Sequence, residues 1–171
     1  MKSKALRALI LTAIFAALSI VLGKFAAINI GDTIRISFEN LPIMLTSFLF
    51  GPVYGAACGL VADLLGCVLR GYMLIPLITV ASTLMGVIPA LMKEMLSFKR
   101  QTLSVMISGF TAHVACSMFI KTVALDAVYN TGFWALMATR APLYAATALV
   151  ESYLCALILK NKFIKKNVSF N

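Results

Sequence analysis

The sequence predicts an all-α fold, a polytopic bundle of six transmembrane helices with both termini in the cytoplasm. Hydrophobic residues make up 61% of the 171 residues and charged residues only 12%, whereas soluble domains are about half apolar and about a quarter charged. The apolar residues gather in long runs, and most charged residues lie between these runs. A chain of this length has room for one such domain, so 1–171 is predicted to form a single transmembrane domain in the cell membrane.

The apolar runs define the predicted helices in order. A spanning helix needs about 20 mostly apolar residues. The first run follows three basic residues but lacks a clear small-x-small cleavage site, so we expect a retained span rather than a signal peptide. Gly51-Pro52 divides the next run into two short helices, because proline favours the start of a helix. The predicted spans are 6–25, 41–51, 52–69, 72–92, 103–122 and 140–159.

The basic residues predict the orientation of the bundle. Of the 15 Lys and Arg residues, ten lie in the terminal segments and in the 93–102 loop. Loops rich in Lys and Arg stay on the cytoplasmic side, so we expect both termini there and the loops at 24–40, 70–72 and 123–139 outside. The net charge of +9 is therefore interpreted as membrane-flank charge, not as a nucleic-acid site.

The apolar segment between Arg35 and Arg70 also carries Asn40 and Asp63. Acidic side chains inside a membrane are costly and usually functional. Seven residues, nearly two helical turns, separate Asp63 from Arg70, which predicts that both share one face with Arg70 about 10 Å nearer the outside. The alternative is that Asp63 pairs with a neighbouring basic group and only locks helix packing.

Basic and aromatic side chains are predicted to gather on the outer side. Guanidinium groups bind carboxylates through paired hydrogen bonds, and aromatic rings can stack on a flat ligand. Trp134 fits an interface anchor as well as a stacking lid, and Arg140 could instead snorkel to the interface. We expect an amphiphilic, aromatic, anionic small molecule as ligand. The candidate binding residues are Arg35, Phe38, Asn40, Asp63, Arg70, Tyr72, Lys121, Trp134, Arg140 and Tyr144.

Glu151 is predicted near the middle of the last span, with no basic residue one turn away. It therefore needs a partner from another helix or a bound proton. The candidate partners are His113, Lys121, Ser108 and Ser117.

No motif in the sequence indicates catalysis or a cofactor. The chain has no P-loop, no HExxH motif and no nucleophile elbow, so we expect it not to be an enzyme and not to hydrolyse ATP. The four cysteines lie in apolar runs without a CxxC pair and are interpreted as small core residues. Neither a metal nor a cofactor is expected.

Several of these features together resemble a known family. The run RISFENLP at 35–42, then Gly51-Pro52, and then Gly59, Asp63 and Gly66 resemble the substrate-binding S components of energy-coupling factor (ECF) vitamin transporters, most closely the folate type. The pair Ala13-x-x-x-Ala17 fits as well, since small residues allow helices to approach closely in a membrane.

The resemblance implies a high-affinity substrate-binding subunit of an ECF-type ABC transporter, which captures folate from outside for ATP-driven uptake. The implied partners are a transmembrane coupling subunit, docked on Ala13 and Ala17, and two cytoplasmic ATPase subunits. The loop between the first two helices would act as a lid.

Folate suits the candidate residues. Its pterin ring offers hydrogen-bond donors to Asp63 and Asn40, and its two carboxylates suit the outer basic residues. Alternatives are an S component for pantothenate, riboflavin or thiamin, a stand-alone secondary transporter coupled to protons, or a small membrane enzyme that uses Asp63 and Glu151 as acid and base.

Overall fold

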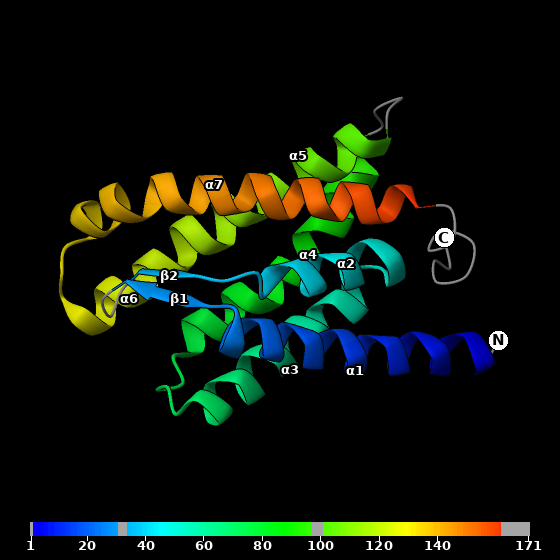
Figure 1. Cartoon of the computed structure of the whole chain (residues 1–171), viewed down its shortest axis with the longest axis horizontal. Helices are drawn as coiled ribbons and strands as arrows, with labels where there is room; N and C mark the ends of the chain where they lie inside the picture. The colour runs from blue at the N-terminus through cyan, green and yellow to red at the C-terminus, as the bar shows by residue number, and fades with distance from the viewer. Residues whose placement is uncertain (1, 31–33, 97–100, 162–171) are drawn as a thin grey trace.

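The computed structural model describes residues 2–30, 34–96 and 101–161 and confirms the predicted all-α bundle (Figure 1). A short antiparallel hairpin, in which Asn29 lies opposite Arg35, joins the first two helices. In chain order the elements are α1 (Lys2–Phe25), β1 (Ile28–Ile30), β2 (Ile34–Ile36), α2 (Asn40–Phe50), α3 (Pro52–Arg70), α4 (Pro76–Met95), α5 (Gln101–His113), the π-helix η1 (Val114–Ile120), α6 (Lys121–Tyr129) and α7 (Phe133–Lys160).

The observed spans agree with the predicted ones in number but not at every end. Five described helical segments are long and apolar enough to cross a membrane, and α2, with 11 residues, is shorter. Helix α4 begins at Pro76 instead of residue 72, as expected for proline in the first helical turn.

The predicted outer loop at 123–139 is wrong. Helix α5 continues through η1 and α6 to Tyr129, and α7 already begins at Phe133. Only a tight connection remains, which contains the positive-φ residues Asn130 and Gly132. Hydropathy did not detect the added turns because they carry polar residues such as Asp126 and Thr139.

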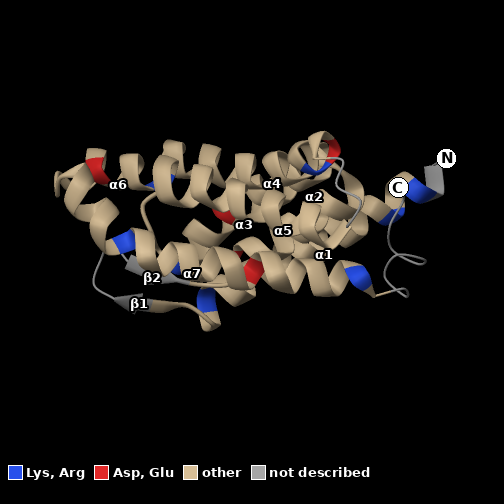
Figure 2. Cartoon of the chain, turned by 90° about the horizontal axis from the view of Figure 1, so that it is seen from above, with Lys and Arg blue, Asp and Glu red and all other residues tan. Residues whose placement is uncertain are grey.

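The connections lie at two opposite ends of the bundle (Figure 1). The beginning of α1 and the end of α7 share one end, here called the terminal end. The hairpin, the α3–α4 connection and the α6–α7 connection lie at the other, here called the hairpin end. Figure 2 shows charged residues mainly toward these two ends, with some acidic positions in the middle of the bundle.

Helices α3 and α4 cross with their backbones in close contact. A Cβ atom on Gly55 would lie 2.1 Å from the carbonyl oxygen of Gly86, and one on Gly59 would lie 2.1 Å from that of Ser82. No real side chain fits at such distances. The glycines therefore fix this crossing, as small residues commonly do between membrane helices.

Helix α1 has two faces of small residues. Ala8, Thr12 and Ala16 are buried against the bundle, whereas Ala13 and Ala17 are exposed. The face formed by Ala8, Thr12 and Ala16 is thus used for internal packing, and the Ala13/Ala17 face remains on the surface of the chain.

Candidate functional site

A cavity lies between α1, α2, α3 and α4. It contains about 250 Å³ of space that protein atoms do not fill, including its open mouth. The part of it that a solvent molecule can occupy measures only about 10 Å³, which is about the space for one water, so a vitamin-sized ligand enters only when the walls move apart. Its lining residues are Ser19, Glu39, Asn40, Ile43, Ala62, Asp63, Arg70 and Ser82.

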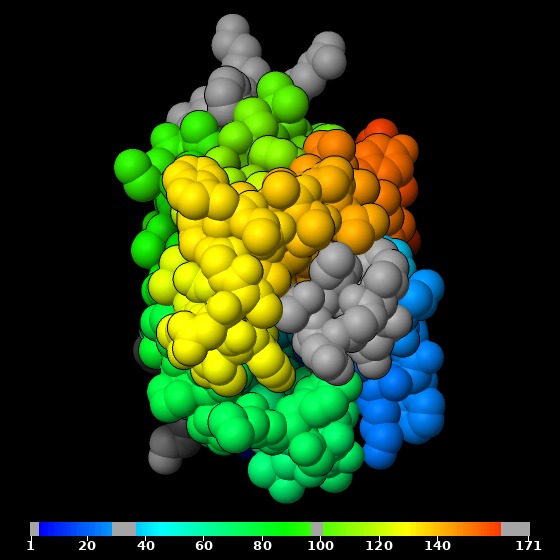
Figure 3. All heavy atoms as spheres, turned by 90° about the vertical axis from the view of Figure 1, so that its left-hand side faces the viewer, coloured from blue at the N-terminus to red at the C-terminus, as the bar shows by residue number. Residues whose placement is uncertain are grey.

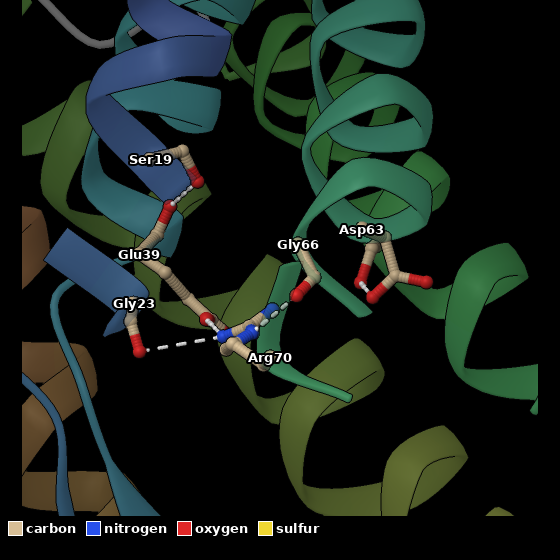
Figure 4. Close-up of polar contacts among 7 residues, drawn as sticks. Ser19, Gly23, Glu39, Asp63, Gly66 and Arg70 are labelled. Atoms are coloured by element: carbon tan, nitrogen blue, oxygen red, sulfur yellow. Dashed lines mark hydrogen bonds and ion pairs between the residues drawn. The ribbon is translucent and has the colours of Figure 1, made fainter. Parts of the chain in front are cut away.

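Arg70 forms one wall of the cavity (Figure 4). Its side chain turns back along α3, where Nε donates to the Gly66 carbonyl oxygen at 2.7 Å. Nη1 pairs with the Glu39 carboxylate at 3.0 Å and donates to the Gly23 carbonyl oxygen at 3.4 Å. Arg70 therefore connects the end of α1, the residue before α2, and α3, instead of standing one to two turns above Asp63.

Gly66 makes this position of Arg70 possible. A Cβ atom at residue 66 would lie 2.5 Å from Nη2 of Arg70. The absence of a side chain leaves the space that the guanidinium fills.

The Asp63 carboxylate points away from the Arg70 guanidinium in Figure 4, although both residues line the cavity. Its Oδ2 accepts a hydrogen bond from Thr79 Oγ1 at 2.7 Å, and its Oδ1 accepts one from Ser82 Oγ at 3.2 Å. Both hydroxyls belong to α4. Among the described residues, Asp63 is thus held by hydroxyl groups and not by a basic partner, and its oxygens retain free acceptor positions toward the cavity.

Sequence reasoning did not assign Ser19, Glu39, Thr79 and Ser82 to the site. Ser19 Oγ donates to the Glu39 carbonyl oxygen at 2.6 Å and so fixes α1 against the start of α2. Glu39 could have been noticed as the acid next to Asn40. The hydroxyl residues gave no signal, because Ser and Thr in helices commonly bond their own backbone.

A second polar group lies behind the cavity wall. Asn40 Nδ2 is 3.5 Å from Nε2 of His113, and the same ring nitrogen contacts the Glu151 carboxylate. This confirms His113 as a partner of Glu151, one of the candidates that the sequence offered.

The remaining candidates lie outside the cavity lining. Arg140 is 2% exposed and sits 4.6 Å from the ring centroid of Tyr144, so it is buried instead of reaching the surface. Trp134 is 80% exposed in the first turn of α7, edge-on to Phe133. Tyr72 is 49% exposed, with its ring near Arg70. Phe38 and Lys121 are half-buried, and the side chain of Arg35 lies outside the described residues.

The candidate residues thus form two separate groups. Asn40, Asp63 and Arg70 meet at the cavity, whereas Lys121, Trp134, Arg140 and Tyr144 belong to α6 and α7. Figure 3 looks onto the hairpin end, where the α6–α7 segment (yellow) lies beside the α3–α4 connection (green).

Residues 3–165 match the model of the family described as ECF-type riboflavin transporter, S component. A Mycoplasma pneumoniae protein described as uncharacterized protein MG313 homolog is 26% identical over 127 residues, which cover 74% of this chain. The match spans 44% of that relative, less than half of its length.

Two solved structures share the fold. The crystal structure of FolT bound with folic acid has a TM-score of 0.72 and 20% identity, covering 87% of this chain and 93% of FolT. A structure of the S component of a bacterial ECF transporter has a TM-score of 0.52 and 22% identity, covering 88% of this chain and 89% of that one.

Proposed function

The chain belongs to the ECF-type riboflavin transporter S component family, and we propose that within this family it captures folate at the outer face of the cell membrane. As an S component it is a multi-pass, substrate-binding part of a transporter and not an enzyme. The proposed partners are an ECF transmembrane coupling subunit and two cytoplasmic ATPase subunits, which supply the energy for uptake.

The main support for folate as the ligand is a pair of hydrogen-bond acceptors in the cavity wall. The pterin ring of folate presents an amino group beside a ring N–H, and a carboxylate can accept both in a bidentate manner. Both Asp63 and Asn40 line the cavity, and the Asn40 amide oxygen has no hydrogen-bond partner in the described part of the chain, which supports these two residues as the acceptors. The isoalloxazine ring of riboflavin instead presents two carbonyl oxygens around its N–H and requires donors.

The pairing of Arg70 suggests where the rest of folate lies. With the pterin ring at Asp63 and Asn40, the aminobenzoyl-glutamate part extends toward the hairpin end. Arg70 is already neutralised by Glu39. The two glutamate carboxylates are therefore assigned to Arg35, Lys121 and Arg140, with Tyr144 and Trp134 as stacking partners.

The proposed orientation rests on the shared position of the two ends of the chain. Both lie at the terminal end (Figure 1), and the segments rich in Lys and Arg place this end in the cytoplasm. The cavity then opens outward, with the connection between α1 and α2 as its lid.

Titration calorimetry on the purified chain in lipid nanodiscs tests the proposal. We expect one site for folic acid, and no comparable heat with riboflavin, pantothenate or thiamin. Binding of another vitamin in place of folic acid would keep the S-component role and reject folate. No binding of any of the four would reject both parts of the proposal.

A further inference from the structure

Behind the cavity wall, an amide is connected to a buried acid–base pair. Asn40, at the start of α2, is 5% exposed; His113, at the end of α5, is 1% exposed; and Glu151, in α7, is 0% exposed. Asn40 alone of the three lines the cavity. Asn40 is therefore the residue through which the position of the proton in the buried His113–Glu151 pair can affect a ligand in the cavity.

The hydrogen bonds of this group depend on where one proton lies. A ring nitrogen carries either a hydrogen or a lone pair, and His113 Nε2 faces both the Asn40 amide and the Glu151 carboxylate. When Glu151 holds the proton, Nε2 is an acceptor and the amide nitrogen of Asn40 faces the ring. When the proton moves from Glu151 Oε2 to Nε2, the ring nitrogen carries an N–H that repels the amide N–H of Asn40, which favours the amide oxygen on that side.

In the structure the amide nitrogen of Asn40 faces His113. The amide oxygen, Oδ1, has no hydrogen-bond partner within the described part of the chain. A buried acceptor without a partner is costly, so this oxygen is available for a donor on the ligand.

We propose that Asn40, His113 and Glu151 form a proton-linked specificity element. The proton shared by His113 and Glu151 determines whether Asn40 presents its amide oxygen or its amide nitrogen to the cavity. The oxygen selects ligand edges rich in N–H donors, such as pterins, and the nitrogen selects edges rich in carbonyl oxygens, such as isoalloxazines. His113 and Glu151 are positioning residues, because they act through Asn40. The inference rests on the proposed function insofar as the cavity must be the ligand site.

Other charged and titratable groups are present on the elements packed around the pair. Glu39, next to Asn40, is paired with Arg70, and Lys93 and Glu94 lie at the far end of α4. The rest lie on η1, α6 and α7: Cys116, Lys121, Asp126, Tyr129, Arg140, Tyr144, Tyr153 and Cys155. The π-helix η1 begins directly after His113, and such irregular turns frequently occur at functional positions.

The chain contains one histidine, so ¹⁵N-imidazole labelling of protein purified without a histidine tag gives the signals of His113 alone. In the ligand-free protein we expect Asn40→Leu and Glu151→Gln each to shift the Nε2 resonance. Ile43→Val, which changes the cavity wall next to Asn40 without touching the polar link, serves as the control and should leave it in place. An Nε2 resonance unaffected by Asn40→Leu overturns the inference, whatever the ligand proves to be.

Ligand binding gives a second readout. Saturating folic acid, with binding verified by calorimetry, should shift the Nε2 resonance of the unmodified chain; verified binding without a shift overturns the inference but leaves the proposed function intact. Glu151→Leu, which can neither hold the proton nor donate to Nε2, should change the ratio of the folic acid and riboflavin affinities at least about fivefold. Glu151→Gln keeps a donor toward Nε2 and should retain the ratio, and an unchanged ratio in Glu151→Leu also counts against the inference. If Glu151→Leu does not fold, His113→Gln removes the ring nitrogen that shares the proton. Absence of binding by any vitamin refutes the proposed function, and the ligand-free spectra then decide on the inference.

Discussion

Asp63 and Arg70 lie on one helix but have different surroundings. Asp63 accepts hydrogen bonds from two hydroxyls of α4 and borders the cavity, while Arg70 is held by Glu39, Gly23 and the carbonyl of Gly66. The acid therefore retains acceptor positions for a ligand. The arginine mainly joins α1, the residue before α2, and α3.

Replacing the Asp63 carboxylate by an amide should weaken ligand binding. In Asp63→Asn the size is retained and the charge is lost, so we expect the folic acid affinity to fall by about tenfold or more, as for a lost charged hydrogen bond of about 1.5–3 kcal/mol. Calorimetry measures the effect. Glu94→Gln removes an exposed acid from the far end of α4 and should leave the affinity unchanged; an equal loss in both variants would refute a direct role of Asp63.

The contact between Gly66 and Arg70 can be tested by a double-mutant cycle. Gly66→Ala places a Cβ atom 2.5 Å from the present position of Nη2, which should displace the guanidinium and lower the melting temperature and the folic acid affinity. In the Arg70→Ala background the added methyl group meets no guanidinium, so its penalty should disappear. Thermal unfolding of the four proteins gives the coupling, and additive effects would show that Gly66 matters for another reason.

At the scale of the elements, the two faces of α1 differ in burial. Ala8, Thr12 and Ala16 pack inside the bundle, while Ala13 and Ala17 are exposed. The exposed pair is the surface that we assign to the coupling subunit, because small side chains allow another helix to approach closely.

Enlarging this exposed face should separate binding from transport. In Ala17→Leu we expect unchanged folic acid binding and reduced ATP-driven uptake in proteoliposomes that contain the complete transporter. Ala57→Leu makes the same change at an exposed position of α3 and should affect neither quantity. Normal uptake by the Ala17 variant would remove α1 from the proposed interface.

The sequence predicted the elements better than their ends and their partners. Apolar runs located the spans, and Gly51-Pro52 located the α2–α3 junction. Trp134 and Arg140 were placed in a loop and at a helix start because the polar turns around them interrupt the apolar run, although both belong to α7. The hydroxyl partners of Asp63 come from α4, and the sequence alone does not reveal how two helices are rotated against each other.

At the scale of the whole molecule, the proposed function assigns the energy for uptake to the coupling and ATPase subunits. Purified chain alone in liposomes should therefore not accumulate folic acid under an imposed proton gradient. Accumulation should appear when the coupling subunit, the ATPases and ATP are added. Radiolabelled folic acid measures both, and gradient-driven accumulation by the chain alone would favour a secondary transporter.

The glycine contacts between α3 and α4 determine which part of the cavity can open. Because Gly55 and Gly86 meet backbone to backbone, these helices cannot slide or rotate past each other without a collision. Asp63, Thr79 and Ser82 therefore move as one rigid wall. We therefore expect the opposite wall to yield: a ligand that enters the cavity should displace the end of α1 and break the hydrogen bonds that Arg70 makes to Gly23 and Glu39.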